Sequence, residues 1–275
     1  MSPLWALMKL PTPPRIRLLG AEVDLITPNE VMSALDFLVL EPRASIVANH
    51  NTYSLSLLRR QPQLRRFFEA ADIIEIDSTV VISWARLLGL PARQQHRSTY
   101  LDWRDAFWAK AGAKGWRVYL LGGRPGVAER AGEHLLSRWP GTRVKAHHGY
   151  FDTARESTGN EAVLADIRAF DPDIILVGMG MPRQEAWILD NHRSLGRGVL
   201  LSVGAAIDYE AGVQKPAPRW LGRCGLEWLY RLIREPRRLA RRYLVDPWIL
   251  TPEAASDVAA SLRRLRRRFS LERPA

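Results

Sequence analysis

One carboxylate in the chain occupies a position suited to acid–base chemistry. Asp77 directly follows the apolar run at residues 73–76, and a helical pattern begins near Thr79. Open α/β sheets bind their ligands at the carboxyl ends of the strands, so a side chain that ends a strand can face the ligand. A general base must lie within hydrogen-bond reach of the hydroxyl that it deprotonates, and this position allows that. The sequence equally allows Asp77 to be the N-cap of the following helix.

Glycines follow two other apolar runs, where they can expose backbone N–H groups to a phosphate. Gly122 and Gly123 follow residues 116–121 and precede a helical pattern, an arrangement that favours phosphate at a helix N-terminus. A dinucleotide-binding enzyme usually adds an acidic residue at the end of the next strand, where it binds the ribose. The next strand-like run, residues 143–147, ends without one. A nicotinamide-dependent oxidoreductase is therefore disfavoured.

The segment at residues 177–188 carries a second glycine turn with polar side chains behind it. Gly178 and Gly180 leave the strand, and Gln184 and Glu185 follow near the start of the predicted helix. We expect these groups to face the same crevice as Asp77. The alternatives are that Glu185 complements the helix dipole and that Gln184 lies on the surface.

Two adjacent histidines, His147 and His148, are the strongest candidates for metal ligands. Successive side chains of a strand point to opposite faces, and no other cluster in the sequence has the spacing of a metal site. We therefore expect a polar strand end and no bound metal. Tyr150 follows at this strand end and is expected to line the crevice.

A parallel sheet would bring these groups together. Six strand-like runs alternate with six helical patterns, which is typical of a parallel sheet with helices on both faces. The strands are predicted at residues 45–48, 73–76, 116–121, 143–147, 173–177 and 198–203. The helices are predicted at residues 54–68, 79–88, 101–113, 127–139, 161–170 and 183–191. A short hairpin near residues 17–26 precedes them.

The excess of basic residues lies at the C-terminal end of the chain. The net charge is +11; residues 213–275 hold 15 Lys and Arg against 6 Asp and Glu, while residues 1–212 hold 25 against 23. We therefore predict an α/β body at residues 1–212 and a basic appendage at residues 213–275. A single cysteine fits a reducing compartment, and no apolar run reaches the roughly 18 residues of a spanning helix. A cytoplasmic protein with at most peripheral membrane contact is expected.

Residues 225–244 are the most distinctive part of the appendage. As a helix they would separate an apolar face from a mainly arginine face, which suits an anionic membrane surface or a phosphorylated ligand. A solvated arginine face over an ordinary core is equally compatible. The segment at residues 254–269 repeats the pattern, with apolar positions Val258, Leu262, Leu265 and Phe269.

The basic charge also raises the alternative of a nucleic-acid-binding protein. The basic residues lie on helices that carry an apolar face, and no nucleic-acid-binding module is recognisable in the sequence. We therefore expect no nucleic acid partner. A homo-oligomer is compatible with the sequence.

Five segments, in this order and spacing, resemble the bacterial WecG/TagA/CpsF family of glycosyltransferases. They cover about residues 17–248 and read YLLGGRPGVAE, HHGYF, DPDIILVGMGMPRQEAWI, SVGAAIDYEAG and LEWLYRLIREPRRLARRYL. The resemblance implies a Rossmann-like α/β body with an appendage that contacts the inner face of the plasma membrane. It also implies an inverting transfer of a sugar from a UDP-sugar to a polyprenyl-diphosphate-linked saccharide. The product would serve exopolysaccharide or other cell-surface polysaccharide synthesis, with no cofactor or divalent metal required.

The resemblance assigns roles to individual residues. Asp77 matches the family's proposed catalytic base, and Asn49 and Gln184 match an asparagine and a glutamine of its crevice. The family's appendage arginines, thought to close over the donor diphosphate, match Arg231, Arg238 and Arg241.

Three positions depart from the family's pattern. Val47 stands where a threonine is common, and Ser78 stands where a glycine usually follows the aspartate; we expect both changes to alter the floor of the pocket. Pro216 replaces an arginine, which would move a phosphate contact to Lys215 or abolish it. These departures leave open an inactive scaffold of a polysaccharide assembly complex.

Overall fold

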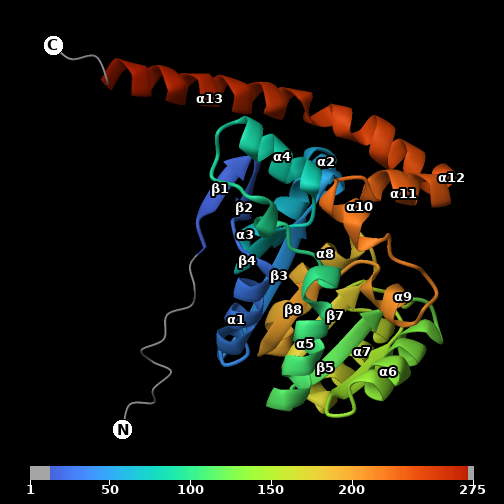
Figure 1. Cartoon of the computed structure of the whole chain (residues 1–275). Coiled ribbons are helices and arrows are strands. Elements are labelled where there is room, and N and C mark those ends of the chain that lie inside the picture. Colours follow the sequence, from blue (N-terminus) through green and yellow to red (C-terminus); the bar gives the residue numbers. More distant parts are fainter. Residues whose placement is uncertain (1–12, 272–275) are drawn as a thin grey trace, which may run out of the picture.

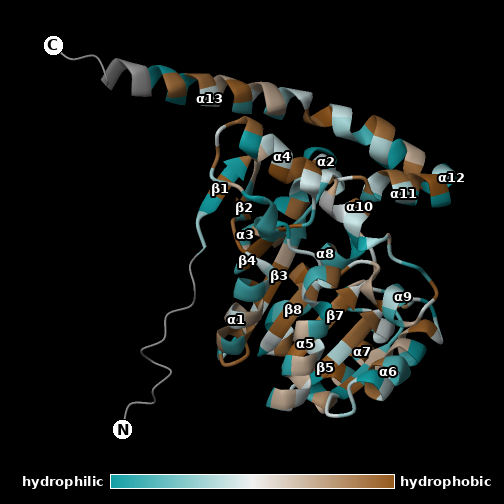
Figure 2. Ribbon diagram, viewed as in Figure 1, coloured by the Kyte–Doolittle hydropathy of each residue, from teal (hydrophilic) through white to brown (hydrophobic). Residues whose placement is uncertain are grey.

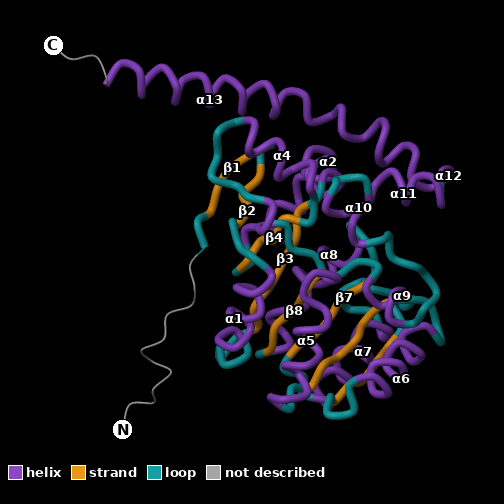
Figure 3. Tube along the Cα trace, viewed as in Figure 1, coloured by secondary structure: helices purple, strands orange, loops and turns teal. Residues whose placement is uncertain are grey.

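The computed structural model describes residues 13–271, which form a six-stranded parallel sheet with helices on both faces (Figure 1, Figure 3). Residues 1–12 of the expected body and 272–275 of the expected appendage lie outside the described part. The strand order is β4-β3-β8-β7-β5-β6. The strands are β3 (Ala44–His50), β4 (Ile73–Ile76), β5 (Arg117–Gly122), β6 (Arg143–His147), β7 (Ile174–Gly178) and β8 (Gly198–Ser202). The predicted fold class is confirmed.

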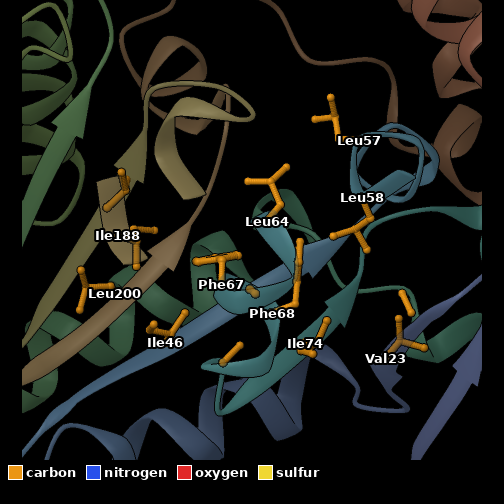
Figure 4. Close-up of a cluster of buried hydrophobic side chains, with 14 of the residues drawn as sticks. Val23, Ile46, Leu57, Leu58, Leu64, Phe67, Phe68, Ile74, Ile188 and Leu200 are labelled. Atoms are coloured by element: carbon orange, nitrogen blue, oxygen red, sulfur yellow. The ribbon is translucent and has the colours of Figure 1, made fainter. Parts of the chain in front are cut away.

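Two apolar clusters, one on each face of the sheet, form the core. Alternate side chains of a strand enter opposite clusters, so that Ile46 packs on one face and Val47 on the other. Figure 4 shows the first cluster, where Phe67 and Phe68 lie beside Ile46 and Ile74. The first face is covered by α2 (Thr52–Arg60), α3 (Arg65–Glu69), α4 (Thr79–Leu87), α7 (Thr158–Phe170) and α8 (Arg183–Asn191). The second is covered by α1 (Pro28–Leu38), α5 (Tyr100–Lys114), α6 (Val127–Arg138) and α9 (Ala206–Glu210).

The structure differs from the sequence prediction in two helices of the body. The pattern at residues 54–68 divides into α2 and α3, because Gln61 precedes a proline and leaves the helical conformation with φ −133° and ψ 77°. Helix α1 was not predicted. Its signal is a capping box, in which the Thr27 side chain and the Glu30 side chain each bind the backbone N–H of the other residue.

The expected hairpin is present and is fixed to the edge of the sheet. Strands β1 (Arg15–Leu18) and β2 (Ala21–Asp24) pair antiparallel. The buried carboxylate of Asp24 accepts a hydrogen bond from the backbone N–H of Ile74 at 2.8 Å and pairs with Arg15 at 2.7 Å. This contact joins the hairpin to β4.

The appendage is a chain of short helices, so the prediction of one helix over residues 225–244 is wrong in its extent. Glu235, the residue before Pro236, has φ −136° and ψ 60°, which ends the helix because the proline ring disfavours a helical residue before it. The elements are α10 (Arg219–Arg223), α11 (Glu227–Arg234), α12 (Pro236–Ala240), a π-helical turn η5 (Arg241–Val245), a 3-10 turn η6 (Asp246–Leu250) and α13 (Thr251–Leu271).

The long helix α13 lies along the same side of the molecule as α2 and α4 (Figure 1). Its Asp257 accepts hydrogen bonds from the backbone of Leu19 at 2.8 Å and from the indole of Trp84 at 3.1 Å. Apolar and polar residues alternate along it (Figure 2). The predicted apolar positions Val258, Leu262 and Leu265 are exposed, while the side chain of Phe269 lies outside the described part. Within residues 13–271, no helix is long and apolar enough to cross a membrane.

Candidate active site

A cavity of about 950 Å³ lies at the carboxyl ends of the parallel strands, between the sheet and the appendage. The ends of β3, β4, β7 and β8 and the turn after β5 contribute to its wall, as expected for an open α/β sheet. The predicted site residues that line it are Asn49, Asp77, Gly123, Tyr150, Gly178, Gly180, Gln184, Arg231 and Arg238. Gly122, Glu185, Lys215 and Arg241 do not line it.

Close packing of two glycines shapes the floor of this cavity. Gly122 and Gly178 end the neighbouring strands β5 and β7, and a Cβ atom built on Gly122 would lie 2.3 Å from the carbonyl oxygen of Gly178. Any larger residue at Gly122 would push these strand ends apart. Gly122 therefore supports the floor from behind, while Gly123 and Gly178 face the cavity.

Asp77 stands at the cavity wall with its carboxylate unengaged. Ser78, and not Asp77, is the N-cap of α4, since the Ser78 hydroxyl accepts a hydrogen bond from the backbone N–H of Val81. The backbone N–H of Asp77 donates to the carbonyl oxygen of His50 at 2.8 Å and so holds the residue at the strand end. Within residues 13–271, the Asp77 carboxylate makes no hydrogen bond or ion pair.

The surroundings of Asp77 raise the pKa of its carboxyl group towards neutral pH. The pKa of Asp77 is raised to about 7, mainly by burial and also by the negative charge of Glu227, while the positive charges of Arg97 and Arg231 oppose the shift. A base with a pKa near the working pH combines a populated basic form with a useful affinity for the proton. This position thus has the properties of a general base.

Another carboxylate, that of Glu75, is buried two residues earlier, on β4. It accepts hydrogen bonds from the Ser98 hydroxyl and from the Trp103 indole, the latter at 3.2 Å. Burial raises the pKa of Glu75 to about 8, although both hydrogen bonds oppose the shift. Since its Oε1 atom is already engaged by two donors, Glu75 is a less suitable base than Asp77.

The appendage brings arginines to the cavity, but not the full set expected. Arg231 is 27% exposed, pairs with Glu227 at 2.9 Å and donates a hydrogen bond to the Tyr209 hydroxyl. Arg238 pairs with Glu235 at 2.6 Å on the cavity rim. Arg241 is 79% exposed and faces Asp246 at 3.6 Å, outside the cavity.

Arg242 lines the cavity and was not predicted. Its guanidinium stacks over the Tyr53 ring, 4.2 Å from the centroid, and its Nε atom is buried without a hydrogen-bond partner. Arg238 and Arg242 are one helical turn apart across α12 and η5, which places both on the cavity side. The four-residue spacing from Arg238 to Arg242 is visible in the sequence. Arg241 is three residues from Arg238, which is also a helical spacing, so the sequence did not show which of the two arginines faces the cavity.

Of the other predicted polar residues, Asn49 and Gln184 line the cavity, whereas Glu185 lies behind its wall. The Asn49 amide donates to Ser202 across β3 and β8. The Gln184 amide oxygen accepts from the Gly180 N–H at 3.1 Å, and its NH₂ donates to Glu185 at 2.8 Å, so Gln184 is buried and not on the surface. Glu185 is buried beneath it, and burial raises the pKa of Glu185 to about 7. Gln184 and Glu185 therefore hold the glycine turn in place.

The three sequence departures have separate structural settings. Val47 is buried in the second core cluster and does not line the cavity, so its side chain does not form the floor. Ser78 caps α4, a contact that a glycine would lose. Lys215 is exposed beside Pro216, and the neighbouring Gln214 lines the cavity instead.

Contacts between the body and the appendage close the cavity. Arg97 is largely buried and donates to Asp102 at 3.0 Å and to Glu227 at 2.8 Å. Glu227 in turn pairs with Arg231, so one chain of charges joins α5, the loop before it and α11. Sequence reasoning missed Arg97 and Glu227, because the contact between them joins residues that are 130 positions apart. Within residues 13–271, no group of three His, Cys, Asp or Glu side chains has the geometry to hold a metal ion.

Comparison with known proteins decides the family. A sequence model of the glycosyl transferase WecG/TagA/CpsF family matches residues 16–264. This chain belongs to that family. It is similar to the N-acetylglucosaminyldiphosphoundecaprenol N-acetyl-beta-D-mannosaminyltransferases of Staphylococcus aureus strains MW2 and MRSA252, among other strains. Each is 27% identical over 237 residues, which cover 82% of this chain and 87% of the relative.

Membership of the WecG/TagA/CpsF family makes the chain a hexosyltransferase. Its candidate catalytic centre is the Asp77 wall of the cavity. This assignment replaces the alternative of a nicotinamide-dependent oxidoreductase, while the expectation of no nucleic acid partner stays a prediction.

Proposed function

We propose that this glycosyltransferase moves a sugar from a UDP-sugar to a polyprenyl-diphosphate-linked saccharide, with inversion at the anomeric carbon. One observation carries the proposal: the carboxylate of Asp77, which makes no hydrogen bond or ion pair within the described residues, faces a cavity that is also lined by arginines from the appendage. The names of the relatives, which specify a diphosphoundecaprenol-linked acceptor and an N-acetylmannosaminyl product, support this class of acceptor.

Asp77 would act as the general base. Its carboxylate accepts the proton of the acceptor hydroxyl while that oxygen attacks the anomeric carbon from the face opposite the leaving group. The bond between the anomeric carbon and the diphosphate oxygen breaks, and UDP leaves with the bonding electrons. A single displacement of this kind inverts the configuration, and a positioned base typically contributes about 10²–10⁴-fold to the rate.

Arginines would stabilise the negative charge that develops on the leaving diphosphate. Arg231 and Arg238 line the cavity on the appendage side and carry fixed positive charges. A guanidinium donates two parallel hydrogen bonds to a phosphate, which a lysine ammonium does not reproduce. We propose that these side chains supply the counter-charge without a divalent metal, while the role of Arg241 stays a prediction.

A direct transfer assay tests the proposal. The full-length protein is incubated with a panel of UDP-sugars and a short-chain polyprenyl-diphosphate-linked N-acetylhexosamine, and the products are identified by mass. We expect one donor to extend the acceptor by one sugar, with a β-linkage by NMR when the donor is α-linked. Absence of product with every donor, or retention of the donor configuration, would contradict the proposal.

We further propose that the enzyme works while bound peripherally to the inner face of the plasma membrane. Exposed apolar side chains lie on η5, η6 and α13 among arginines, which is the pattern of an interfacial surface. Basic residues near an anionic surface contribute roughly 1 kcal/mol each. These apolar residues are Leu244, Val245, Trp248, Val258, Leu262 and Leu265.

Vesicle flotation tests the membrane proposal. The double variant Leu262→Asp/Leu265→Asp should lose most binding to vesicles with anionic lipid, because it places two carboxylates in the apolar stripe of α13. Leu136→Asp on α6 is the matched control, since Leu136 is also exposed but lies on a helix of the body. Equal binding by the double variant and wild type would refute the assignment of this surface.

A further inference from the structure

A second cavity of about 280 Å³ adjoins the first at Asp77. It lies between the N-termini of α2 and α4 on the body side and α11, η5 and η6 on the appendage side. The residues that line both cavities are Asn51, Asp77, Glu227, Arg231 and Arg242. The Asp77 carboxylate therefore has access to two separate ligand spaces.

We propose that the second cavity binds the acceptor, and that it holds the sugar ring attached to the polyprenyl diphosphate. The inference rests on the proposed function, in which a base must touch the acceptor hydroxyl while the donor occupies another space. The size of each cavity fits this division. A cavity of about 280 Å³ is at the small end of ligand sites and suits one sugar ring, whereas about 950 Å³ accommodates a nucleotide sugar.

Aromatic side chains give the second cavity the character of a sugar site. Tyr53, Trp228 and Tyr243 line it, and the rings of Trp228 and Tyr243 meet edge to face with centroids 6.2 Å apart. Sugar rings present apolar C–H faces and polar hydroxyl edges, which match the apolar faces and polar handles of tyrosine and tryptophan. Trp228 lines the second cavity but not the larger one.

Arg242 provides a place for the phosphate that follows the sugar. Within the described residues its guanidinium makes no hydrogen bond and no ion pair within 4 Å, although it is held between the rings of Tyr53 and Tyr243. A partly buried cation without a counter-charge favours an anionic ligand, because the ligand supplies the missing charge and hydrogen bonds.

The lipid tail has an exit beside this cavity. Tyr243 and Pro247 line the wall, and the residues around them, Leu244, Val245 and Trp248, are 52%, 58% and 76% exposed. An exposed apolar patch next to a phosphate site fits a ligand whose diphosphate carries a hydrocarbon chain. This continuity favours a lipid-linked acceptor over a free sugar phosphate.

Filling the cavity tests the inference. Val80 is half-exposed on α4 and lines only the second cavity, so Val80→Trp should raise the KM for a short-chain polyprenyl-diphosphate-linked acceptor at least about tenfold and leave the donor KM within about twofold. Leu87→Trp is the matched control, because Leu87 is exposed on the same helix and lines neither cavity. It should behave as wild type.

A second variant and a binding measurement separate the outcomes. Trp228→Leu removes the aromatic platform and should also raise the acceptor KM while UDP binding by calorimetry is unchanged. Unchanged acceptor KM in both variants, or a donor KM that rises as much as the acceptor KM, would overturn the inference. If wild type itself transfers no sugar from any donor, the proposed function fails, and this outcome is distinct from failure of the acceptor site alone.

Discussion

Replacing Asp77 by asparagine removes the proposed base with almost no change in size. The carboxylate makes no hydrogen bond or ion pair within residues 13–271, so the substitution breaks no described contact. The helix cap of α4 is also preserved, because Ser78 provides it. We therefore expect a folded protein that binds UDP with wild-type affinity and turns over slowly.

The magnitude follows from the role and from the pKa. Loss of a general base lowers the rate by about 10²–10⁴-fold, which corresponds to about 3–5 kcal/mol of transition-state stabilisation. Since burial raises the pKa of Asp77 to about 7, the base is about one-tenth ionised at pH 6 and about nine-tenths ionised at pH 8. The wild-type kcat/KM should thus rise about tenfold over this range, and Asp77→Asn should lose this dependence.

The assay measures initial rates of transfer against pH, with Asp208→Asn as the control. Asp208 also lines the cavity and burial also raises its pKa, so its substitution removes a similar charge from the same space. We expect the control to keep the rise between pH 6 and 8 and to lose much less activity. Turnover of Asp77→Asn within about threefold of wild type, or an unchanged pH profile, would refute the assignment.

The remaining predictions concern charge, metal and stability. Arg231→Gln should raise the donor KM more than Arg241→Gln, because only Arg231 lines the cavity, and equal losses in steady-state kinetics would contradict the placement. Prior dialysis against EDTA should leave transfer activity within about twofold, since arginines are proposed to supply the counter-charge. Leu239→Ala should weaken the packing of the appendage on the body by about 2–5 kcal/mol, because this side chain is buried, and the melting temperature should fall. In the folded protein the pKa of Glu75 is raised to about 8, so the wild-type free energy of unfolding should fall as the pH rises from about 4.5 to 8. Glu75→Gln does not titrate, so its free energy of unfolding, measured by urea titration, should not show this fall.

The strands and the side chains that end them could be predicted from the sequence. Apolar runs such as residues 174–177 are long enough and rich enough in branched residues to indicate buried strands, and parallel pairing follows from their alternation with helices. Because all parallel strands end at one edge, Asn49, Asp77 and Gly178 had to meet there. Helix α1 was not predicted, although the capping box formed by Thr27 and Glu30 marks its start in the sequence.

The appendage could not be predicted to the same depth. Its arginines recur at several helical spacings. Because the helix breaks at Pro236, the residues before and after the break do not share one helical face, and the spacing alone does not show which arginines point the same way. The π-helical turn at η5 shifts the register again. As a result Arg241 faces solvent while Arg242 enters the cavity, although the two are adjacent in the sequence.

The sequence by itself determined the α/β class, the basic C-terminal end and the position of Asp77 at a strand end, because hydrophobic periodicity and charge are local properties of the chain. Only the tertiary structure decided that Ser78 caps the helix, that Asp77 stays unengaged and that Arg97 and Glu227 join the body to the appendage. The contact between Arg97 and Glu227 joins residues distant in the sequence, and burial, the largest cause of the raised pKa of Asp77, depends on how the whole chain packs. The Ser78 cap is a local contact, but the sequence allowed Asp77 the same role, and only the folded backbone selects between them.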